Sequence, residues 1–310
     1  MFQISNDIQK EINDISGLHL EVDRDLTKFS TMKLKSTGSI CLVETVDALK
    51  ALLKILKDRG IRYEPIGWGA NVILPEEPNT LFIKLNMTFD KAVVNPKGTE
   101  FWLPASAPLN ILTSLASKYG FRGWEVFTGI PASLGGAIAM NAGTSLGEIG
   151  ELVKEVRILR ESGNLEGFKI QNNSFSYRKN HFLNDGDIII EALLTYRTID
   201  KRVPEEIKNY LEMRNNSQPL REKTCGCMFK NKVETRANHS VTCRAGQYID
   251  IMGLKGLTID GLRVSPKHAN FMENQAQTSA NAVKKLVSLT LRELELHYGV
   301  SFETEVRLPD

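Results

Sequence analysis

The 310-residue chain is long enough for about two domains, and its 42% hydrophobic and 25% charged residues are ordinary for a globular protein. Its 39 Lys and Arg against 37 Asp and Glu give a formal charge of +2, which argues against a polyanion such as nucleic acid as the main ligand. Four cysteines are too few for a disulfide scaffold, and the charged start MFQISNDIQKEINDI lacks the apolar core of a signal peptide, so we expect a cytoplasmic protein.

Hydrophobic periodicity predicts helices and strands along the first 200 residues. Apolar residues on one face predict a helix over 45–60, with Thr45 as its N-cap and Gly60 as its stop. A second helix is predicted over 109–120. Runs rich in β-branched and aromatic residues predict strands at 81–85, 100–107, 154–160 and 187–197.

The character of the chain changes near residue 200, where we place a domain boundary. A polar helix is expected first, in DKRVPEEIKNYLEMR, and later a long amphipathic helix over 278–298 that Gly299 ends. The closing SFETEVRLP is predicted to be a strand. The uncharged stretch 126–147 has the length of a membrane span, but Gly, Pro, Ser, Thr and Asn fill half of it. We therefore expect a buried backbone segment there and no membrane association.

Two glycine-rich segments could hold an anionic cofactor. They are PIGWGANVIL, over 65–74, and TGIPASLGGAIAMNAG, over 128–143. Glycine lets the backbone approach a ligand closely, and successive N–H groups can cradle an anion. Neither segment fits the dinucleotide-binding fingerprint or the Walker pattern. We infer a nucleotide cofactor held by a different fold, although a tight turn and a packed structural loop would explain each segment taken alone.

Seven motifs occur in an order that is typical of one enzyme family: GWGANVIL, GIPASLGGAIAMNAG, SFSYRKNHF, CGCMFKN, GLKG, VSPKHANFMEN and FETEVR. From about residue 27 to 308, the chain thereby resembles the UDP-N-acetylenolpyruvoylglucosamine reductases, flavoenzymes of bacterial peptidoglycan synthesis. The short link between YRTIDKRVPEE and QPLREKTCGC resembles the shorter form of this family.

The resemblance implies an α+β protein. An FAD-binding domain of two subdomains, of the PCMH or vanillyl-alcohol-oxidase type, would be followed by an α+β substrate-binding domain. The implied boundaries are 1–26 for an N-terminal helical extension, 27–200 for the FAD-binding domain with subdomains at about 27–85 and 86–200, 203–298 for the substrate-binding domain, and 299–310 for a C-terminal strand that returns to the active site.

The resemblance also implies the reaction. NADPH as co-substrate would reduce non-covalently bound FAD, which in turn would reduce UDP-N-acetylglucosamine enolpyruvate to UDP-N-acetylmuramate. Tyr177, Lys230 and Asn231 would meet this nucleotide-sugar substrate, and we expect a monomer. The implied FAD-binding residues lie in the two glycine-rich segments: Gly67, Trp68, Gly69, Ala70, Asn71, Val72, Gly129, Ile130, Pro131, Ala132, Ser133, Gly135, Gly136, Ala137, Asn141, Ala142 and Gly143.

Cys227, Arg178 and Glu305 are the implied catalytic residues. Cys227 stands where most family members carry the serine that protonates C2 of the substrate. A neutral thiol can take this role, because its ordinary pKa of about 8.5 keeps it mostly protonated near neutral pH. Arg178 would brace the developing negative charge with parallel donors, and Glu305 would help to polarise the substrate carboxylate. Taken singly, Arg178 and Glu305 are also explained as solvated surface residues, as is Lys230, and Glu303 lies two positions from Glu305.

Two other interpretations stay open. Cys225, Cys227, His239 and Cys243 offer four soft ligands for zinc, although Cys-x-Cys is a less common zinc motif than a two-residue spacing. A disulfide between Cys225 and Cys227 would be strained, and we otherwise expect no metal. The second alternative is a catalytically inactive relative that binds flavin or nucleotide, because cysteine replaces serine at 227 and no aromatic residue follows Gly143.

Overall fold

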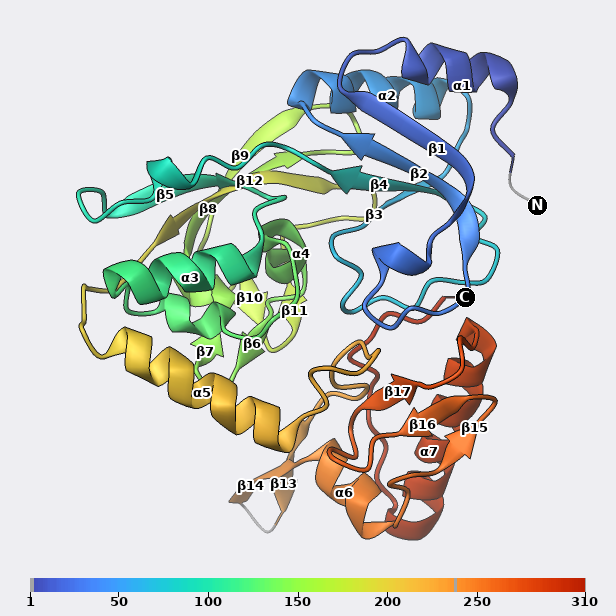
Figure 1. The fold of residues 1–310 in the computed structure, drawn as a ribbon, viewed down its shortest axis with the longest axis vertical. Coiled ribbons are helices and arrows are strands. Elements are labelled where there is room, and N and C mark those ends of the chain that lie inside the picture. Colours follow the sequence, from blue (N-terminus) through green and yellow to red (C-terminus); the bar gives the residue numbers. More distant parts are fainter. Residues whose placement is uncertain (1–2, 237–238, 310) are drawn as a thin grey trace. The chain divides into compact units, whose positions relative to one another are not determined.

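The computed structural model describes residues 3–236 and 239–309, which form two compact units (Figure 1). Unit 1 comprises Met1–Arg24, Gly38–Trp68 and Asn79–Glu212, and unit 2 comprises Asp25–Thr37, Gly69–Pro78 and Met213–Asp310. Each unit is thus assembled from segments that lie far apart in the sequence. The first glycine-rich segment is divided between them after Trp68.

The first sheet of unit 1 has the strand order β1-β2-β4-β3, in which β4 runs parallel to both β2 and β3. Helices α1 and α2 lie along it (Figure 1), and their apolar side chains join those of the sheet in one buried cluster. The elements are α1 (Asn6–Asn13), β1 (Leu18–Asp25), β2 (Thr37–Val43), α2 (Val46–Asp58), β3 (Tyr63–Pro65) and β4 (Leu81–Leu85).

The second sheet of unit 1 is antiparallel, with the order β5-β12-β8-β9. A cluster of fully buried side chains that includes Phe121, Trp124 and Phe127 packs between this sheet and the helical elements. The elements are β5 (Glu100–Pro104), α3 (Leu109–Tyr119), η3 (Trp124–Phe127), α4 (Leu134–Ala139), β8 (Val153–Leu159), β9 (Leu165–Lys169) and β12 (Ile188–Thr195).

Short hairpins and turns complete unit 1, and the longer helix α5 begins in unit 1 and ends in unit 2. The hairpins are β6–β7 and β10–β11, and α5 continues past the last residue of unit 1. The elements are η2 (Lys91–Val93), β6 (Gly143–Thr144), β7 (Gly147–Glu148), η4 (Ile149–Leu152), β10 (Phe175–Ser176), β11 (Lys179–Asn180) and α5 (Val203–Ser217).

Unit 2 has a three-stranded antiparallel sheet, β15-β16-β17, against which α7 packs, and α6 packs against α7. Hydrogen bonds connect the two N-terminal segments of this unit to each other and to the residues just before α7. The hydroxyl of Ser36 donates to the Pro75 carbonyl at 2.7 Å, and the Lys35 amide donates to the Thr278 carbonyl at 3.0 Å. The elements are η1 (Thr27–Phe29), β13 (Lys232–Arg236), β14 (His239–Cys243), α6 (Ala245–Ile251), β15 (Thr258–Ile259), β16 (Leu262–Val264), β17 (Met272–Asn274) and α7 (Ala280–Tyr298).

The predicted helices are confirmed with their caps. The hydroxyl of Thr45 accepts the Ala48 amide at the start of α2, at 3.2 Å. Gly120 and Gly299 end α3 and α7 in the left-handed conformation that glycine adopts without a steric penalty. The strands predicted at 81–85, 154–160 and 187–197 correspond to β4, β8 and β12, and the strand predicted at 100–107 ends earlier, at Pro104.

Three expectations about the chain's organisation differ from the structure. Residues 1–26 hold β1 as well as a helix, because alternate residues of β1 can pack on the sheet. The change near residue 200 falls at the start of α5, and the units divide within that helix. The closing SFETEVRLP forms isolated bridges rather than a strand, because Thr304 pairs with Phe229 whereas Arg307 pairs with Val72, so no single neighbour extends a ladder.

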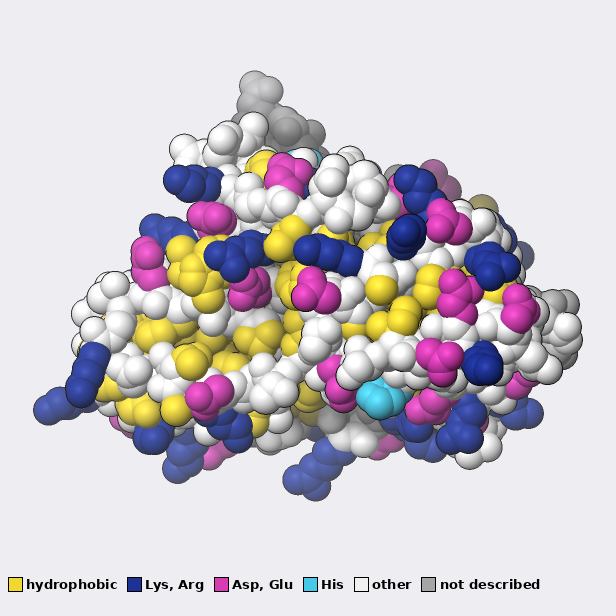
Figure 2. Space-filling model, turned by 90° about the horizontal axis from the view of Figure 1, so that it is seen from above, with side chains coloured by type: hydrophobic (Ala, Val, Ile, Leu, Met, Phe, Trp, Pro, Cys, Tyr) yellow, Lys and Arg dark blue, Asp and Glu magenta, His cyan; other side chains and the backbone are white. Residues whose placement is uncertain are grey.

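Acidic and basic side chains are interspersed on the face that Figure 2 shows, and neither sign forms a continuous field there. This pattern agrees with the balanced composition of the chain. Within residues 3–236 and 239–309, no helix is both long and apolar enough to cross a membrane.

Candidate functional site

The two glycine-rich segments meet in unit 1 at Gly67. A Cβ atom added to Gly67 would lie 2.7 Å from the Ser133 Oγ and 3.6 Å from the Gly136 Cα. Gly135 packs equally closely on β5's end, where an added Cβ would lie 2.7 Å from the Ala105 Cβ. Only glycine permits these approaches, so bare backbone lines this part of unit 1. Such a surface fits a large planar or anionic cofactor that must approach the main chain.

Part of the second segment's backbone is already hydrogen-bonded within the chain. The amides of Leu134 and Gly135 donate to the carbonyls of Ala107 and Ala105, both at 2.8 Å. These bonds fix the segment on the end of β5 and leave fewer amides for a ligand than the sequence suggested. The cofactor-binding roles of residues 129–143 therefore stay predictions, and the rigid attachment of the segment supports them.

Lys84 reaches the same place from β4. Its ammonium Nζ donates to the Gly67 carbonyl at 2.6 Å, and burial lowers the pKa of Lys84 from its ordinary 10.5 to about 8. The periodic pattern of β4 predicted a strand residue at 84 but gave no reason to single out this lysine.

The remainder of the first segment belongs to unit 2. Gly69 has a φ of +61°, and an added Cβ would lie 2.2 Å from the Phe29 carbonyl oxygen. Beyond it, the side-chain amide of Asn71 donates to the Glu305 carbonyl at 2.9 Å, and the Arg307 amide donates to the Asn71 carbonyl at 3.0 Å. Asn71, predicted as a cofactor residue, thus holds the C-terminal segment that carries Glu305.

Cys227 and Glu305 lie in neighbouring stretches of unit 2. The amide of Glu305 donates at 2.8 Å to the carbonyl of Met228, the residue that follows Cys227 in the sequence. Met228 in turn donates to the Asn270 carbonyl at 2.7 Å, and the Asn270 side chain bonds both backbone groups of Phe229. The Cys227 side chain is partly exposed, as a proton donor to a ligand must be. Two of the three predicted catalytic residues are therefore brought together by main-chain bonds.

Arg178 occupies the turn of the β10–β11 hairpin in unit 1. Its φ of +56° is uncommon for a residue with a Cβ. The guanidinium is largely buried: Nη2 donates to the Gly143 carbonyl at 2.8 Å, and the ring of Tyr177 lies 4.9 Å from its Cζ. Tyr177 itself is exposed. The turn therefore presents Arg178 in a fixed orientation next to the end of the second glycine-rich segment.

Glu148, which no sequence pattern singled out as a site residue, lies beside the guanidinium of Arg178. One of its carboxylate oxygens lies 3.8 Å from the Arg178 Nη1, and the other accepts the side-chain amide of Asn141 at 2.6 Å. Asn141 is buried at a φ of +49°, and it also donates to the Ser176 carbonyl at 2.9 Å and accepts the Gly150 amide at 3.0 Å. Both N–H donors of Asn141 are thus used within the chain, and a cofactor contact by this residue stays a prediction.

Lys230 and Asn231, predicted to meet the substrate, follow Cys227 in unit 2. The Lys230 ammonium lies 3.0 Å from the exposed carboxylate of Glu303, and its amide donates to the Glu303 carbonyl. The side-chain oxygen of Asn231 accepts the Ala245 amide at 3.2 Å. Glu303 therefore pairs with Lys230 at the surface, whereas Glu305 lies closer to Cys227 in the hydrogen-bond pattern.

The zinc interpretation is not favoured. The buried Cys225 thiol contacts the sulfur of Met32 at 3.7 Å, and burial raises the pKa of Cys225 to about 12, which disfavours the thiolate that zinc requires. No group of three His, Cys, Asp or Glu that could hold a metal occurs among the residues that the structure describes. The side chain of His239 lies outside the described part of the chain.

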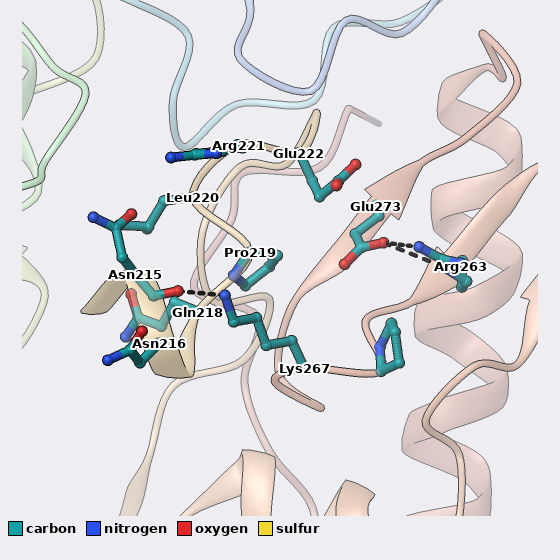
Figure 3. Close-up of a pocket in the computed structure, with 11 residues that line it drawn as sticks. Asn215, Asn216, Gln218, Pro219, Leu220, Arg221, Glu222, Arg263, Lys267 and Glu273 are labelled. Atoms are coloured by element: carbon teal, nitrogen blue, oxygen red, sulfur yellow. Dashed lines mark hydrogen bonds and ion pairs between the residues drawn. The ribbon is translucent and has the colours of Figure 1, made fainter. Parts of the chain in front are cut away.

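A polar pocket of about 500 Å³ opens in unit 2 (Figure 3). In Figure 3, Lys267 extends toward the carbonyl of Asn215, to which it donates, and Arg263 points at Glu273, to which its Nη2 donates at 2.5 Å. The pocket offers both cationic donors and amide or carboxylate acceptors, which suits a polar ligand. Its lining comprises Asn215, Asn216, Gln218, Pro219, Leu220, Arg221, Glu222, Arg263, Pro266, Lys267 and Glu273.

Comparisons with known proteins match both units. Residues 39–168 match an FAD binding domain, and residues 218–309 match the C-terminal domain of UDP-N-acetylenolpyruvoylglucosamine reductase. The enzymes of that name from Clostridioides difficile and Streptococcus agalactiae are 30% and 31% identical over 96% and 97% of this chain and 95% and 97% of theirs. The crystal structure of UDP-N-acetylenolpyruvylglucosamine reductase from Thermus caldophilus matches with a TM-score of 0.75 and 28% identity, over 94% of this chain and 98% of that one.

Proposed function

Because the chain belongs to the UDP-N-acetylenolpyruvoylglucosamine reductase family, we propose that it reduces UDP-N-acetylglucosamine enolpyruvate to UDP-N-acetylmuramate, with FAD as cofactor and NADPH as reductant. Its fold is the α+β FAD-binding fold of that family. The observation that supports an active enzyme best is the backbone pairing of the Cys227 loop with the Glu305 segment. A bacterial cytoplasmic location and a monomeric state are further expectations.

The chemistry that FAD supplies when bound is hydride transfer from NADPH to C3 of the enolpyruvyl ether. The backbone of Gly67 and of the 129–143 segment is proposed to hold this cofactor, because glycines there leave the main chain uncovered. The hydrogen bonds from Leu134 and Gly135 to the residues that follow β5 would keep the binding surface rigid before the cofactor binds.

Cys227 is proposed to give the proton that C2 requires after C3 has received hydride. The S–H bond breaks as the C2–H bond forms, and the resulting thiolate regains a proton from water. The partial exposure of Cys227 supports this role, because a buried thiol such as Cys225 has no access to substrate or solvent.

Arg178 is proposed to stabilise the negative charge that develops on C2 and on the adjacent carboxylate. The hydrogen bond from Arg178 to the Gly143 carbonyl and the nearby Glu148 carboxylate fix the guanidinium before the substrate binds. Little reorganisation would therefore accompany the reaction. Glu305 is proposed to polarise the same carboxylate, and the bonds of its main chain to Met228 and Asn71 limit its movement.

Two measurements test the proposal. The purified protein should carry, or gain on addition of FAD, the yellow flavin chromophore, and it should oxidise NADPH over many turnovers only when the enolpyruvyl substrate is present. A protein that binds no FAD would contradict the proposal.

The role of Cys227 is tested by Cys227→Ser and Cys227→Ala. Serine replaces the thiol by a hydroxyl, which can also donate a proton, and should retain turnover. Alanine has no donor and should lower turnover by about 100-fold or more, the usual contribution of a general acid. Flavin reduction by NADPH, observed in single turnover, should change less than about twofold in both variants. Normal turnover by the alanine variant would exclude Cys227 as the acid.

A further inference from the structure

Lys84 is a partly buried lysine on β4, and the described part of the chain places no anion beside its ammonium. Its polar partner is the neutral carbonyl of Gly67, at 2.6 Å. Among residues 3–236 and 239–309, no carboxylate lies within ion-pair distance of Lys84, whereas Lys50 on the surface of α2 pairs with Asp47 at 3.8 Å. A desolvated ammonium without a negative partner destabilises a protein, so its position calls for an explanation.

The electrostatics of Lys84 come from burial alone. Burial lowers the pKa of Lys84 to about 8, and no charged group contributes to the shift. The titratable groups on the strands packed against β4 are Cys41 in β2 and Tyr63 and Glu64 in β3. Because burial is the cause of the shift, an anion that arrives from outside the chain would offset the charge and would keep Lys84 protonated.

The carbonyl that Lys84 holds lies where the two glycine-rich segments meet. The Gly67 backbone packs against Ser133 and Gly136. In a trans peptide the C=O and the following N–H point to opposite sides, so the bond from Lys84 to the Gly67 oxygen also fixes the direction of the Trp68 N–H. Lys84 therefore orients the Gly67–Trp68 peptide of the proposed cofactor surface and places a positive charge beside it.

We propose that Lys84 supplies, from the carbonyl side of the Gly67–Trp68 peptide, the positive charge that attracts the diphosphate of FAD, and that through the Gly67 carbonyl it is a positioning residue for the cofactor-binding backbone. FAD is the source of negative charge that the family implies, and its diphosphate carries that charge at neutral pH. The inference rests on the proposed placement of FAD against Gly67. It assigns to a lysine within a strand a role that neither glycine-rich segment can supply, since both lack charged side chains.

The test compares Lys84→Met and Lys84→Gln with Lys50→Met as a surface control. Full-length protein freed of flavin is titrated with FAD and with ADP, which carries the diphosphate but no flavin. Lys84→Met should weaken both ligands by about ten- to a hundredfold, the range of a Coulomb attraction across one peptide in a partly buried site, and Lys50→Met should change neither by more than about twofold. Lys84→Gln keeps a donor for the Gly67 carbonyl but lacks the charge, so it should lose affinity through the charge alone and lose less than Lys84→Met.

The melting temperature of the flavin-free protein separates this role from a structural one. Removal of a desolvated charge should leave that temperature unchanged or raise it, while the rise on FAD addition becomes smaller. In the unaltered protein, FAD affinity should fall as the pH rises above about 8, where Lys84 loses its proton, and Lys84→Met should not show this fall.

Three results would overturn the inference. They are FAD affinity within twofold of the unaltered protein in Lys84→Met, a lowered melting temperature with an unchanged response to FAD, and weaker FAD binding with unchanged ADP binding, which would assign the charge to the flavin ring. If Lys84→Met does not fold, Lys84→Gln decides by the same criteria. Failure of the unaltered protein to bind FAD would instead refute the proposed function.

Discussion

Gly67→Ala offers a direct test of the contact between the two glycine-rich segments. No strain arises in the backbone, because the φ of Gly67 is outside the left-handed region. The added Cβ would meet one atom too closely, the Ser133 Oγ at 2.7 Å, while its next neighbour, the Gly136 Cα, lies at an ordinary 3.6 Å. The steric penalty is therefore concentrated in a single hydroxyl oxygen.

The magnitude follows from two opposing effects. Overpacking costs about 1–3 kcal/mol, and replacement of glycine by alanine at a permitted conformation returns about 0.4–1 kcal/mol through the unfolded chain. We expect Gly67→Ala alone to lower the free energy of unfolding by about 1–2 kcal/mol. In a Ser133→Ala background, where the oxygen is absent, the same change should be neutral or stabilising by about 0.4–1 kcal/mol.

Ser133→Ala is a suitable second change, since the Ser133 side chain makes no capping bond at the start of α4. The assay is urea unfolding of flavin-free protein followed by tryptophan fluorescence. All three tryptophans, Trp68, Trp102 and Trp124, belong to unit 1, so the signal reports the unit that carries the changes. Additive effects within about 0.5 kcal/mol would refute the contact, because independent sites do not couple.

Three further changes probe the units separately. Gly69→Ala should destabilise unit 2 by more than about 3 kcal/mol, because its Cβ would lie 2.2 Å from the Phe29 carbonyl oxygen, whereas Gly60→Ala, at a similar φ of +63° but with no atom within 4 Å, should cost about 1–2 kcal/mol; equal losses in urea unfolding would contradict the clash. Arg122 hydrogen-bonds Glu206 and lowers the pKa of that carboxyl, so the stability that the pair contributes is present above about pH 4.5 and is lost as the pH falls through the lowered pKa. Arg122→Gln should cost about 1–3 kcal/mol at pH 7 and progressively less as the pH falls below about 4.5, and thermal melts across this range that show a constant loss would refute this account.

The sequence alone determined the local elements of this protein. The helix of residues 45–60 and the helix that ends at Gly120 were predictable because apolar periodicity, an N-cap hydroxyl and a terminal glycine are all encoded within a few neighbouring positions. The glycine-rich segments were predictable for the same reason, since their composition is informative without reference to the rest of the chain, whereas the role of the Cys227 loop was implied by the resemblance to a known family.

Only the tertiary structure decided which of these residues act together. Asn71 bonds the Glu305 main chain across 234 positions, and Lys84 reaches Gly67 from a strand that carries no motif. Glu148 supports Arg178 through an ion pair that no periodicity signals. Such contacts depend on strand register, turn geometry and the burial of charge, which arise when distant segments pack. Short-range pattern therefore predicted the parts of the site, and long-range packing set their partners.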